Sequence, residues 1–464
     1  MNKKGFTLVE LLAVIVILAI ILVIAIPQII ETINSSRLSA IRDSALLIAT
    51  QAEKDYLAQK TLDHNYSKEI ISCQDVIKIS NDYDTCTIMY NNVGEATVKL
   101  TGAENGKFSG ITCNGTKENM ECVKGKLSVF KEEIMNLVKN YDSTSNDIIR
   151  LDSLSSSCTN SFRYDNTTEN NLRYVGSNPC NYVYFNCDNY DKQTQSSCEL
   201  WRIVSVGDSI KIVKNESIGS SSWDSSRSDE PDVSSGKTDV SGFNDWRYAD
   251  LMKTLNDNYS SNETKNNKGE VKIANNSLYW DRKNGLCSMG NSNDLQSCNY
   301  QTKGLKDSTK KFIDTKVWHT GGTEYIASNG YGYGNVDNIF AKERGNKTWT
   351  GRESTWTGKV ALLYPSDYVY ATDDNTCLNS LPHNWNETNN SNCLNNYLNK
   401  GVDYWTIQPL FKNHHYVLYI NSNGQLKDIN ASKIFNIYPS VYLVDGVLLK
   451  SGNGSVENPY QITL

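Results

Sequence analysis

The chain has 464 residues, and 46 Lys and Arg against 52 Asp and Glu give it a formal net charge of −6. Single hydrophobic cores stop growing near about 250 to 300 residues, so this length excludes one ordinary domain and predicts at least two folded parts. Binding to duplex nucleic acid needs clustered Lys and Arg, which this acidic balance does not favour, so we expect no general nucleic-acid binding.

An apolar segment opens the chain. All but two of residues 6–26 are apolar, and residues 11–30 carry no charge. A helix of roughly 20 residues crosses a hydrocarbon core of about 30 Å, which predicts a transmembrane helix over residues 6–30. Glu10 lies near the start of this helix, where a carboxylate is costly in lipid and needs a partner that neutralises it.

The residues around Glu10 closely resemble the type IV prepilin signal. Lys3 and Lys4 precede Gly5 and Phe6, and Glu10 follows at the offset of that family. The resemblance implies that residues 1–5 are a leader, that prepilin peptidase cuts between Gly5 and Phe6, and that Phe6 is then N-methylated. It also implies assembly with other pilin subunits guided by Glu10, whose charge the new amine of Phe6 would balance.

Two other interpretations of this segment stay open. A secretory signal would end at a small-residue site such as the one at residues 23–25, but Glu10 would interrupt its apolar region, which is also too long. A plain signal anchor explains the span, and Lys3 and Lys4 would hold its N-terminus in the cytoplasm. That anchor does not explain why Gly5 and Phe6 precede Glu10.

A long helix continues beyond the apolar segment. After Pro27, where the pilin family commonly has a kink, apolar residues recur at helical spacing on one face, with charged residues between them. This amphipathic pattern predicts one helix over residues 6–60. Proline removes a backbone donor and clashes with the preceding turn, so we expect a bend or local unwinding near Pro27.

The next part of the chain changes to strand patterns. Residues 95–122 alternate between apolar and polar around a turn at 102–106, which predicts short antiparallel strands. A long helix followed by a small disulfide-tied sheet resembles a pilin, which implies a pilin-like head over residues 61–125. Residues 127–141 look helical and residues 142–146 are polar, so we expect a helix and a linker over residues 126–150.

The larger part, residues 151–464, is rich in Asn, Ser, Tyr and Trp, and all nine Trp lie there. Alternating segments predict strands at 200–206, 210–213, 360–364, 403–407, 416–420 and 438–443, and the clearest internal helix is expected at 245–259. Many short strands, long loops and few helices predict an α+β domain.

The order of these segments resembles an uncharacterised family of Gram-positive bacterial surface domains. The matching segments are the Trp201-Arg202-Ile203 strand and residues 246–256, 362–367, 405–409 and 438–443, and residues 451–460 look like a family terminus. The resemblance implies a fold related to C-type-lectin-like and formylglycine-generating-enzyme-like domains. The whole fold class is therefore expected to be α+β, a pilin fold followed by a larger disulfide-stapled domain.

The 12 Cys fall as four in the first part and eight in the second, and none lies in the apolar segment. No C-x-x-C spacing occurs, so thioredoxin-like and zinc-ribbon sites are excluded and structural disulfides outside the cytoplasm are expected. The eight later Cys allow many connectivities, which leaves the pairing open. Nearest-neighbour pairing gives Cys73 with Cys86, Cys113 with Cys122, Cys158 with Cys180, Cys187 with Cys198, Cys287 with Cys298, and Cys377 with Cys393.

The sequence offers little for catalysis or metal binding. Asp373, Asp374 and Asn375 could ligate calcium as in lectins, but such clusters more often form turns. His414 and His415 are adjacent, and consecutive strand residues point to opposite faces, so we expect that they do not share a ligand. We therefore expect no enzyme activity, no cofactor and no metal site.

Aromatic residues suggest a recognition surface. Tyr325, Tyr331, Tyr333 and Trp349 lie in a Gly- and Asn-rich stretch, residues 321–351, where a core would be hard to sustain. Tyr offers large contact area at low entropy cost, so these residues are candidates for binding a carbohydrate or protein ligand. The alternative is that such aromatics fill the core of a β-rich domain.

Together these observations predict a type IV pilin-like minor or tip subunit. It would be a single-pass membrane protein with an extracellular C-terminus that is processed, enters a cell-surface filament and displays an adhesion or ligand-binding domain. One alternative is a pseudopilin of a type II secretion or DNA-uptake system. Another is a surface enzyme tethered by the pilin helix.

Overall fold

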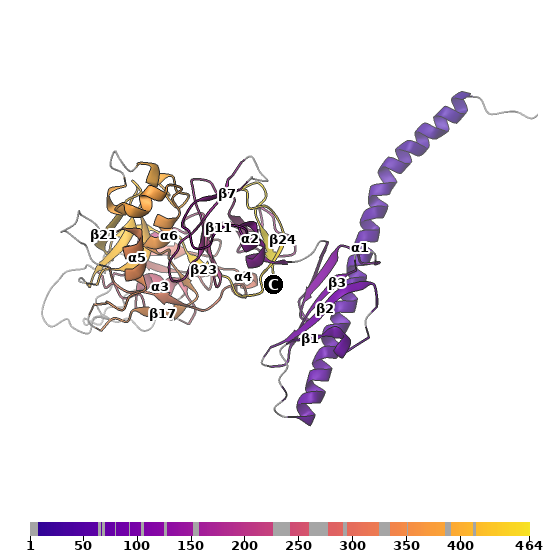
Figure 1. The fold of residues 1–464 in the computed structure, drawn as a ribbon, viewed down its shortest axis with the longest axis horizontal. Helices are drawn as coiled ribbons and strands as arrows, with labels where there is room; N and C mark the ends of the chain where they lie inside the picture. The colour runs from indigo at the N-terminus through magenta and orange to yellow at the C-terminus, as the bar shows by residue number, and fades with distance from the viewer. Residues whose placement is uncertain are drawn as a thin grey trace, which may run out of the picture. The chain divides into compact units, whose positions relative to one another are not determined.

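The computed structural model describes residues 8–63, 66, 70–78, 80–91, 93–103, 106–124, 128–151, 157–225, 242–258, 277–290, 295–323, 335–349, 351–385, 391–411 and 414–464. Within these ranges, the side chains of residues 8–32, 34, 70, 123–124, 128 and 391 are not described. The chain divides into two compact units, residues 1–128 and 129–463 (Figure 1).

The first unit begins with α1 (Leu8–Leu62), a helix of 55 residues. The expected helix over residues 6–60 is thus present from Leu8. The helix continues without a break through Pro27, so the local unwinding expected there does not occur, and the bend stays a prediction. In its second half the residues at helical spacing that face inward are buried, namely Ile41, Ala45, Ile48, Ala49, Ala52 and Tyr56.

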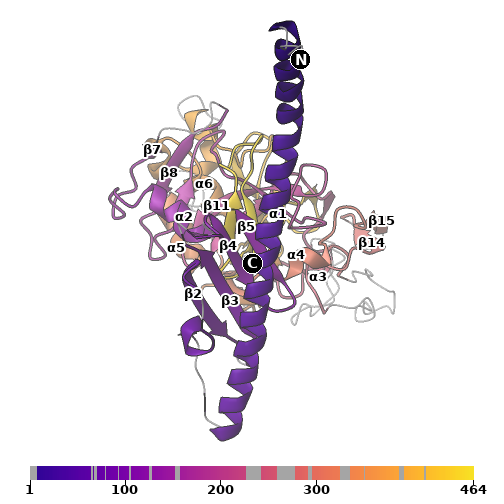
Figure 2. The same ribbon diagram turned by 90° about the vertical axis from the view of Figure 1, so that its right-hand side faces the viewer.

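Five antiparallel strands form one sheet in the order β1-β2-β3-β4-β5. α1 lies along this sheet (Figures 1 and 2). Burial alternates strictly along β3, as expected for a sheet with one face on a helix and one face toward solvent. The elements are β1 (Ile70–Ser72), the 3-10 helix η1 (Cys73–Asp75), β2 (Tyr83–Tyr90), β3 (Ala96–Gly102), β4 (Ile111–Gly115) and β5 (Met120–Lys124).

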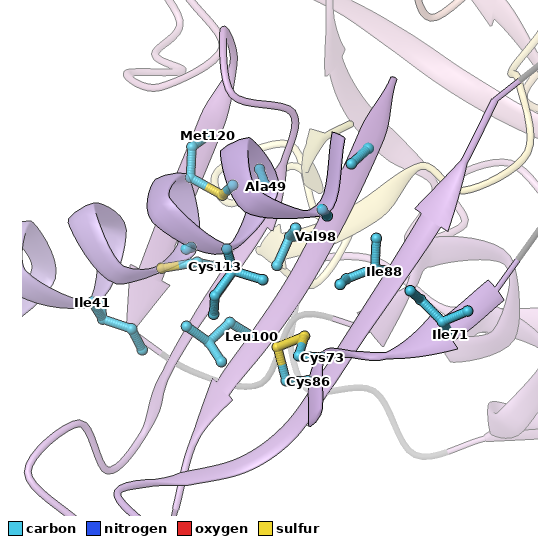
Figure 3. Close-up of a cluster of buried hydrophobic side chains, with 14 of the residues drawn as sticks. Ile41, Ala49, Ile71, Cys73, Cys86, Ile88, Val98, Leu100, Cys113 and Met120 are labelled. Atoms are coloured by element: carbon cyan, nitrogen blue, oxygen red, sulfur yellow. A yellow bond between two sulfur atoms is a disulfide. The ribbon is translucent and has the colours of Figure 1, made fainter. Parts of the chain in front are cut away.

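A single hydrophobic core joins α1 to the sheet. Figure 3 shows Ile88, Val98 and Leu100 of the strands beside Ile41 and Ala49 of the helix. Small alanines on the helix let it approach the strands closely, because close packing leaves no room for larger side chains there.

The turn between β2 and β3 also depends on a small residue. Gly94 has φ +83, and a Cβ there would lie 2.6 Å from the Tyr56 ring. Only glycine adopts this conformation readily and leaves the ring its space. The Tyr90 hydroxyl donates a hydrogen bond to the Ala52 carbonyl at 3.1 Å, so helix and sheet are joined by a polar contact as well.

The second unit contains several sheets. β18-β23-β12-β11-β9-β8-β7 form one, with β10 also paired to β11, and β13-β22-β19-β20-β21 form another. The strands are β7 (Ile149–Leu151), β8 (Asn160–Tyr164), β9 (Leu172–Tyr174), β10 (Tyr182–Phe185), β11 (Glu199–Val206), β12 (Ile210–Lys214), β13 (Ser220–Ser222), β14 (Asn284–Ser288), β15 (Leu295–Asn299), β16 (Lys316–His319), β17 (Thr355–Gly358), β18 (Val360–Ala361), β19 (Tyr404–Pro409), β20 (Tyr416–Ile420), β21 (Leu426–Asn430), β22 (Ile434–Asn436), β23 (Ser440–Tyr442), β24 (Leu448–Ser451) and β25 (Gln461–Thr463).

Short helices connect these strands. They are α2 (Phe130–Leu137), α3 (Asp250–Leu255), α4 (Asp307–Lys310), α5 (Val336–Glu343) and α6 (Pro365–Tyr370), with 3-10 helices η3 (Asn375–Asn379), η4 (Pro382–Asn384) and η5 (Ser391–Leu394). The mixture of sheets and short helices confirms an α+β architecture for residues 151–464. Residues 126–150 contain β6 (Ser128–Val129), α2 and a turn-rich segment, and from Val129 on they belong to the second unit.

Three predicted elements of the second unit are shorter in the structure. The helix expected at 127–141, of which 127 lies outside the described residues, is present as α2 over Phe130–Leu137. α3 occupies only Asp250–Leu255 of the helix expected at 245–259, of which 259 lies outside the described residues. The strand expected at 360–364 ends at Ala361, because Pro365 begins α6 and Tyr364 caps it. Proline is favoured in the first helical turn, where its missing N–H is not needed.

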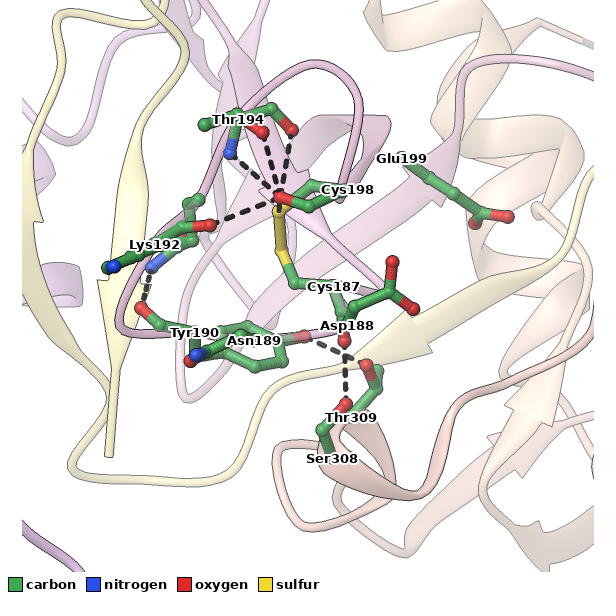
Figure 4. The surroundings of a disulfide bond; sticks show 12 residues. Cys187, Asp188, Asn189, Tyr190, Lys192, Thr194, Cys198, Glu199, Ser308 and Thr309 are labelled. Atoms are coloured by element: carbon green, nitrogen blue, oxygen red, sulfur yellow. Dashed lines mark hydrogen bonds between the residues drawn. A yellow bond between two sulfur atoms is a disulfide. The ribbon is translucent and has the colours of Figure 1, made fainter.

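Six disulfides staple the chain, and they are the six that nearest-neighbour pairing predicts. Two lie in the first unit and four in the second. Figure 4 shows Cys187–Cys198, which closes a loop next to Tyr190. The Tyr190 hydroxyl lies 3.0 Å from the Thr309 hydroxyl, and Ser308 donates to the Cys187 carbonyl at 2.6 Å, so this loop is joined to α4.

Among the residues whose side chains are described, no helix is long and apolar enough to span a membrane. The side chains of residues 8–32, where the transmembrane helix is expected, are not among them.

The packing of α1 predicts that Ala52→Leu destabilises the first unit. Ala52 is fully buried, and overpacking such a site costs about 1 to 3 kcal/mol. Amide exchange in β3, followed by mass spectrometry on the full chain, should become about fivefold faster or more. Ala58→Leu is the matched control, because Ala58 is exposed on the same helix. Equal exchange rates in the two variants would contradict the prediction.

Candidate functional site

The N-terminal candidate residues belong to a part that the structure does not describe in full. Gly5 and Phe6 lie outside the described residues. Glu10 and Pro27 belong to α1, but only their backbone is described and not their side chains. The cleavage, methylation and assembly roles of these residues therefore stay predictions from sequence.

The second unit contains a small polar pocket of about 140 Å³. Its walls come from the β8–β9 turn, the β11–β12 turn, β16, the end of α5, the start of α6 and β23. We call it the polar pocket, and its lining residues are Glu169, Asn171, Asp208, Ser209, Lys316, Val317, His319, Arg344, Tyr364 and Tyr442.

A buried ionic cluster lies next to the polar pocket. The Asp367 carboxylate accepts hydrogen bonds from the Lys211 ammonium at 2.5 Å and from the Arg173 guanidinium at 2.6 Å. The Arg173 guanidinium also contacts the Asp165 carboxylate at 2.9 Å. Burial opposes ionisation of Asp367, but Lys211 and Arg173 outweigh it and hold its pKa at about 2. The Lys211 ammonium also lies 4.1 Å from the centroid of the Tyr364 ring, which forms one wall of the pocket.

The position of Asp367 follows from the local sequence. It is the third residue of α6, and it accepts the backbone N–H of Tyr364 at 2.9 Å. An acidic residue in the first turn of a helix is favoured, because it satisfies a free amide and the positive end of the helix dipole. The same carboxylate therefore caps α6 and neutralises two cations.

Arg344 joins a second pair of carboxylates at the pocket wall. Its guanidinium contacts Glu343 at 2.6 Å and Glu169 at 2.8 Å. Burial raises the pKa of Glu343 to about 7, whereas Arg344 overcomes the effect of burial on Glu169 and lowers its pKa to about 2. Glu343 also accepts the backbone N–H and the hydroxyl of Ser366 at 2.8 and 2.5 Å, which ties α5 to α6.

His319 contributes an imidazole to the pocket. Its backbone N–H donates to the Tyr364 hydroxyl at 2.7 Å. Burial, and then the charge of Arg344, lower the pKa of the imidazole below its ordinary value of 6.5. The ring is therefore neutral at pH 7, with one nitrogen that donates and one that accepts.

Another cavity holds the residues considered for calcium. Asp373, Asp374 and Asn375 line an open cavity of about 430 Å³. Asp374 accepts the Thr376 N–H at 2.8 Å and caps η3, so it forms the turn that such residues commonly form. In the part that the structure describes, no group of three or more His, Cys, Asp or Glu could hold a metal ion.

The predicted recognition aromatics are not brought together in the described residues. Tyr325, Tyr331 and Tyr333 lie outside them, and Trp349 is half-buried with its ring 5.3 Å from that of His414. The expectation that His414 and His415 point to opposite faces is wrong, since their rings lie 4.6 Å apart. Both residues lie before the start of β20, so the alternation of side chains along a strand does not apply to them.

Most of the polar pocket could not be predicted from the sequence. Glu169, Asn171, Asp208, Ser209 and Arg344 carry no motif, and they lie far apart in the chain. The one local signal was Pro365 followed by Asp367, which is typical of a capped helix start. The partners of Asp367 could not be read from it.

The ionic cluster predicts that Asp367→Asn destabilises the second unit. The variant keeps the side-chain shape but leaves Arg173 and Lys211 buried with less negative charge, which costs about 3 to 5 kcal/mol. Calorimetry of the full chain should show a lower unfolding temperature. Asp307→Asn is the control, because Asp307 is 95% exposed in its pair with Lys310, and its effect should be small. A comparable loss in both variants would contradict the prediction.

Residues 1–26 match the family model described as a prokaryotic N-terminal methylation motif. Neither the search of curated proteins nor the search of solved structures gave a match. The motif supports a type IV pilin-like or pseudopilin precursor that is processed by prepilin peptidase and assembles with other pilins.

Proposed function

We propose that this chain is a minor or tip subunit of a type IV pilin-like surface filament, and that residues 129–463 are displayed outside the cell to bind a ligand. Before assembly, the apolar start of α1 spans the membrane once, and the C-terminus is extracellular. The observation that carries this proposal is the methylation motif at residues 1–26, within which a helix of 55 residues begins at Leu8.

The balance of charge around Glu10 supports assembly in a filament. An isolated carboxylate within lipid is costly, and cleavage after Gly5 creates an amine close enough to neutralise it. That amine belongs to the same helix or to an identical neighbour. Pairing with the amine of a neighbour favours a subunit packed among others of its kind over an anchor that stays alone.

The size of the second unit supports a minor or tip position. Residues 129–463 form a unit much larger than the helix and sheet before it. Such a bulk on every subunit would crowd a tightly packed helical assembly, whereas it is tolerated on a few subunits or at the end.

The build of the second unit supports display outside the cell. Its four disulfides persist only in an oxidising compartment. A rigid scaffold with a polar pocket suits ligand binding, which rigid sites perform with little loss of conformational entropy. The likeness of residues 151–464 to Gram-positive surface domains of lectin-like fold points the same way and stays a prediction.

Processing can be tested with Gly5→Ala. The peptidase must bring the bond after Gly5 into a tight site, so the variant should remain in the membrane as full-length precursor. Intact-mass measurement should find the leader retained, with no methylated Phe6. A normal N-terminal Phe6 in the variant would refute the cleavage assignment.

Assembly can be tested with Glu10→Ala. The variant should be cleaved normally yet enter filaments poorly, because the amine of Phe6 loses its partner. Glu10→Asp is the matched control, since it keeps the charge and should assemble better. Immunoblots of sheared filament fractions would measure incorporation, and equal incorporation of all three proteins would contradict the proposal. Recovery only with secretion or DNA-uptake components would instead indicate a pseudopilin.

A further inference from the structure

The polar pocket has no net charge to offer a ligand. Glu169 and Asp208 balance Lys316 and Arg344 among its lining residues, and His319 is neutral at pH 7. Arg344 is already paired with Glu169 and Glu343, and Lys316 contacts Asp314 at 3.1 Å. An anionic ligand would have to displace one of these pairs, so the charges favour a neutral ligand.

Several polar groups of the pocket have no hydrogen-bond partner among the described residues. Ser209 is only 7% exposed, and no described residue bonds to its hydroxyl. Buried hydroxyls are nearly always paired, so this one calls for an explanation. Among the described residues, nothing bonds to the ring nitrogens of His319 or to the Tyr442 hydroxyl. The Tyr364 hydroxyl accepts the His319 N–H and still has its own proton to donate.

These groups suit a ligand that both donates and accepts hydrogen bonds. A neutral imidazole and three hydroxyls can each act as donor and acceptor. The exposed carboxylate of Asp208 on the rim adds an acceptor. Hydroxyl groups of a ligand match this set, whereas a purely apolar ligand would leave it unsatisfied.

The same pocket also has apolar surfaces. Val317 is 55% exposed at the rim, and the rings of Tyr364 and Tyr442 form part of the wall. A sugar ring carries hydroxyls around its edge and C–H groups on its faces, so it matches both kinds of surface. The volume holds several water molecules and so admits one sugar residue or its edge, but not a longer chain.

We propose that the polar pocket binds a terminal residue of a neutral carbohydrate, with Ser209, His319 and Asp208 bonding its hydroxyls and Val317 and Tyr442 contacting its C–H face. This inference rests on the proposed display of the second unit and names the class of ligand. It requires no metal ion. Sugar binding is weak at a single small pocket, so a filament carrying several copies gains avidity.

Saturation-transfer NMR on the full chain tests the inference. The probes are glucose, galactose, mannose, N-acetylglucosamine and N-acetylgalactosamine, and the detergent must have no sugar head group. At least one sugar should receive saturation from the protein in the presence of a chelator. Absence of transfer to all five would overturn the proposal.

Two pocket variants and one control locate the binding. Ser209→Leu fills the pocket and Val317→Trp covers its rim, so each should weaken binding at least tenfold. Ser422→Leu is the control, because Ser422 is an exposed serine in another hairpin turn. Val317→Trp replaces an exposed residue, so it reports on the pocket even where Ser209→Leu fails to fold. Sugar binding that persists in a folded Val317→Trp variant would place the site elsewhere and overturn the proposal.

The outcome is distinguishable from failure of the proposed function. A chain that is cleaved after Gly5 and enters filaments, yet gives no sugar signal, contradicts the carbohydrate inference alone. A chain that binds a sugar through the pocket but is never found in filaments contradicts the filament role alone.

Discussion

The contact of Asp367 with Arg173 and Lys211 organises the second unit. One carboxylate caps α6 and neutralises cations from β9 and β12, so it joins a helix to two strands of the large sheet. Buried charges are stable only when they are paired and hydrogen-bonded. Because each partner comes from a different element, the elements must meet in one arrangement for all the charges to be satisfied.

The polar pocket is a consequence of that arrangement. Arg344 binds Glu343 and Glu169 beside the cluster, and Glu343 bonds Ser366 at the start of α6. These charged groups are paired with one another, and the uncharged polar groups that line the cavity include hydroxyls and a neutral imidazole. A rigid charged wall thus presents a surface without net charge, and this is the basis for inferring a neutral, hydroxyl-bearing ligand.

The two units are stabilised by different interactions, an apolar core in the first and a buried ionic cluster in the second. This difference explains how well the structure of each unit could be predicted. The core between α1 and its sheet is apolar, with alanines at helical spacing and alternation along β3. Both periods are visible in sequence, so the helix and the strands after residue 95 are predicted near their observed places, whereas β1 and β2 are not predicted. The sequence leaves the Cys connectivity open, and all six disulfides match nearest-neighbour pairing, which closes short loops at low entropic cost. In the second unit α3 and the strand at 360 were shorter than expected, since local caps and Pro365 ended them.

The sequence by itself determined the features that depend on residues close together in the chain. These are the prepilin-like signal around Gly5, Phe6 and Glu10, the long helix, the presence of structural disulfides and the α+β character of the second part. Only the tertiary structure decided which charges pair and which polar groups find no partner in the described part of the chain. Glu169, Ser209, His319 and Arg344 meet through contacts between distant segments, and no local spacing encodes such contacts.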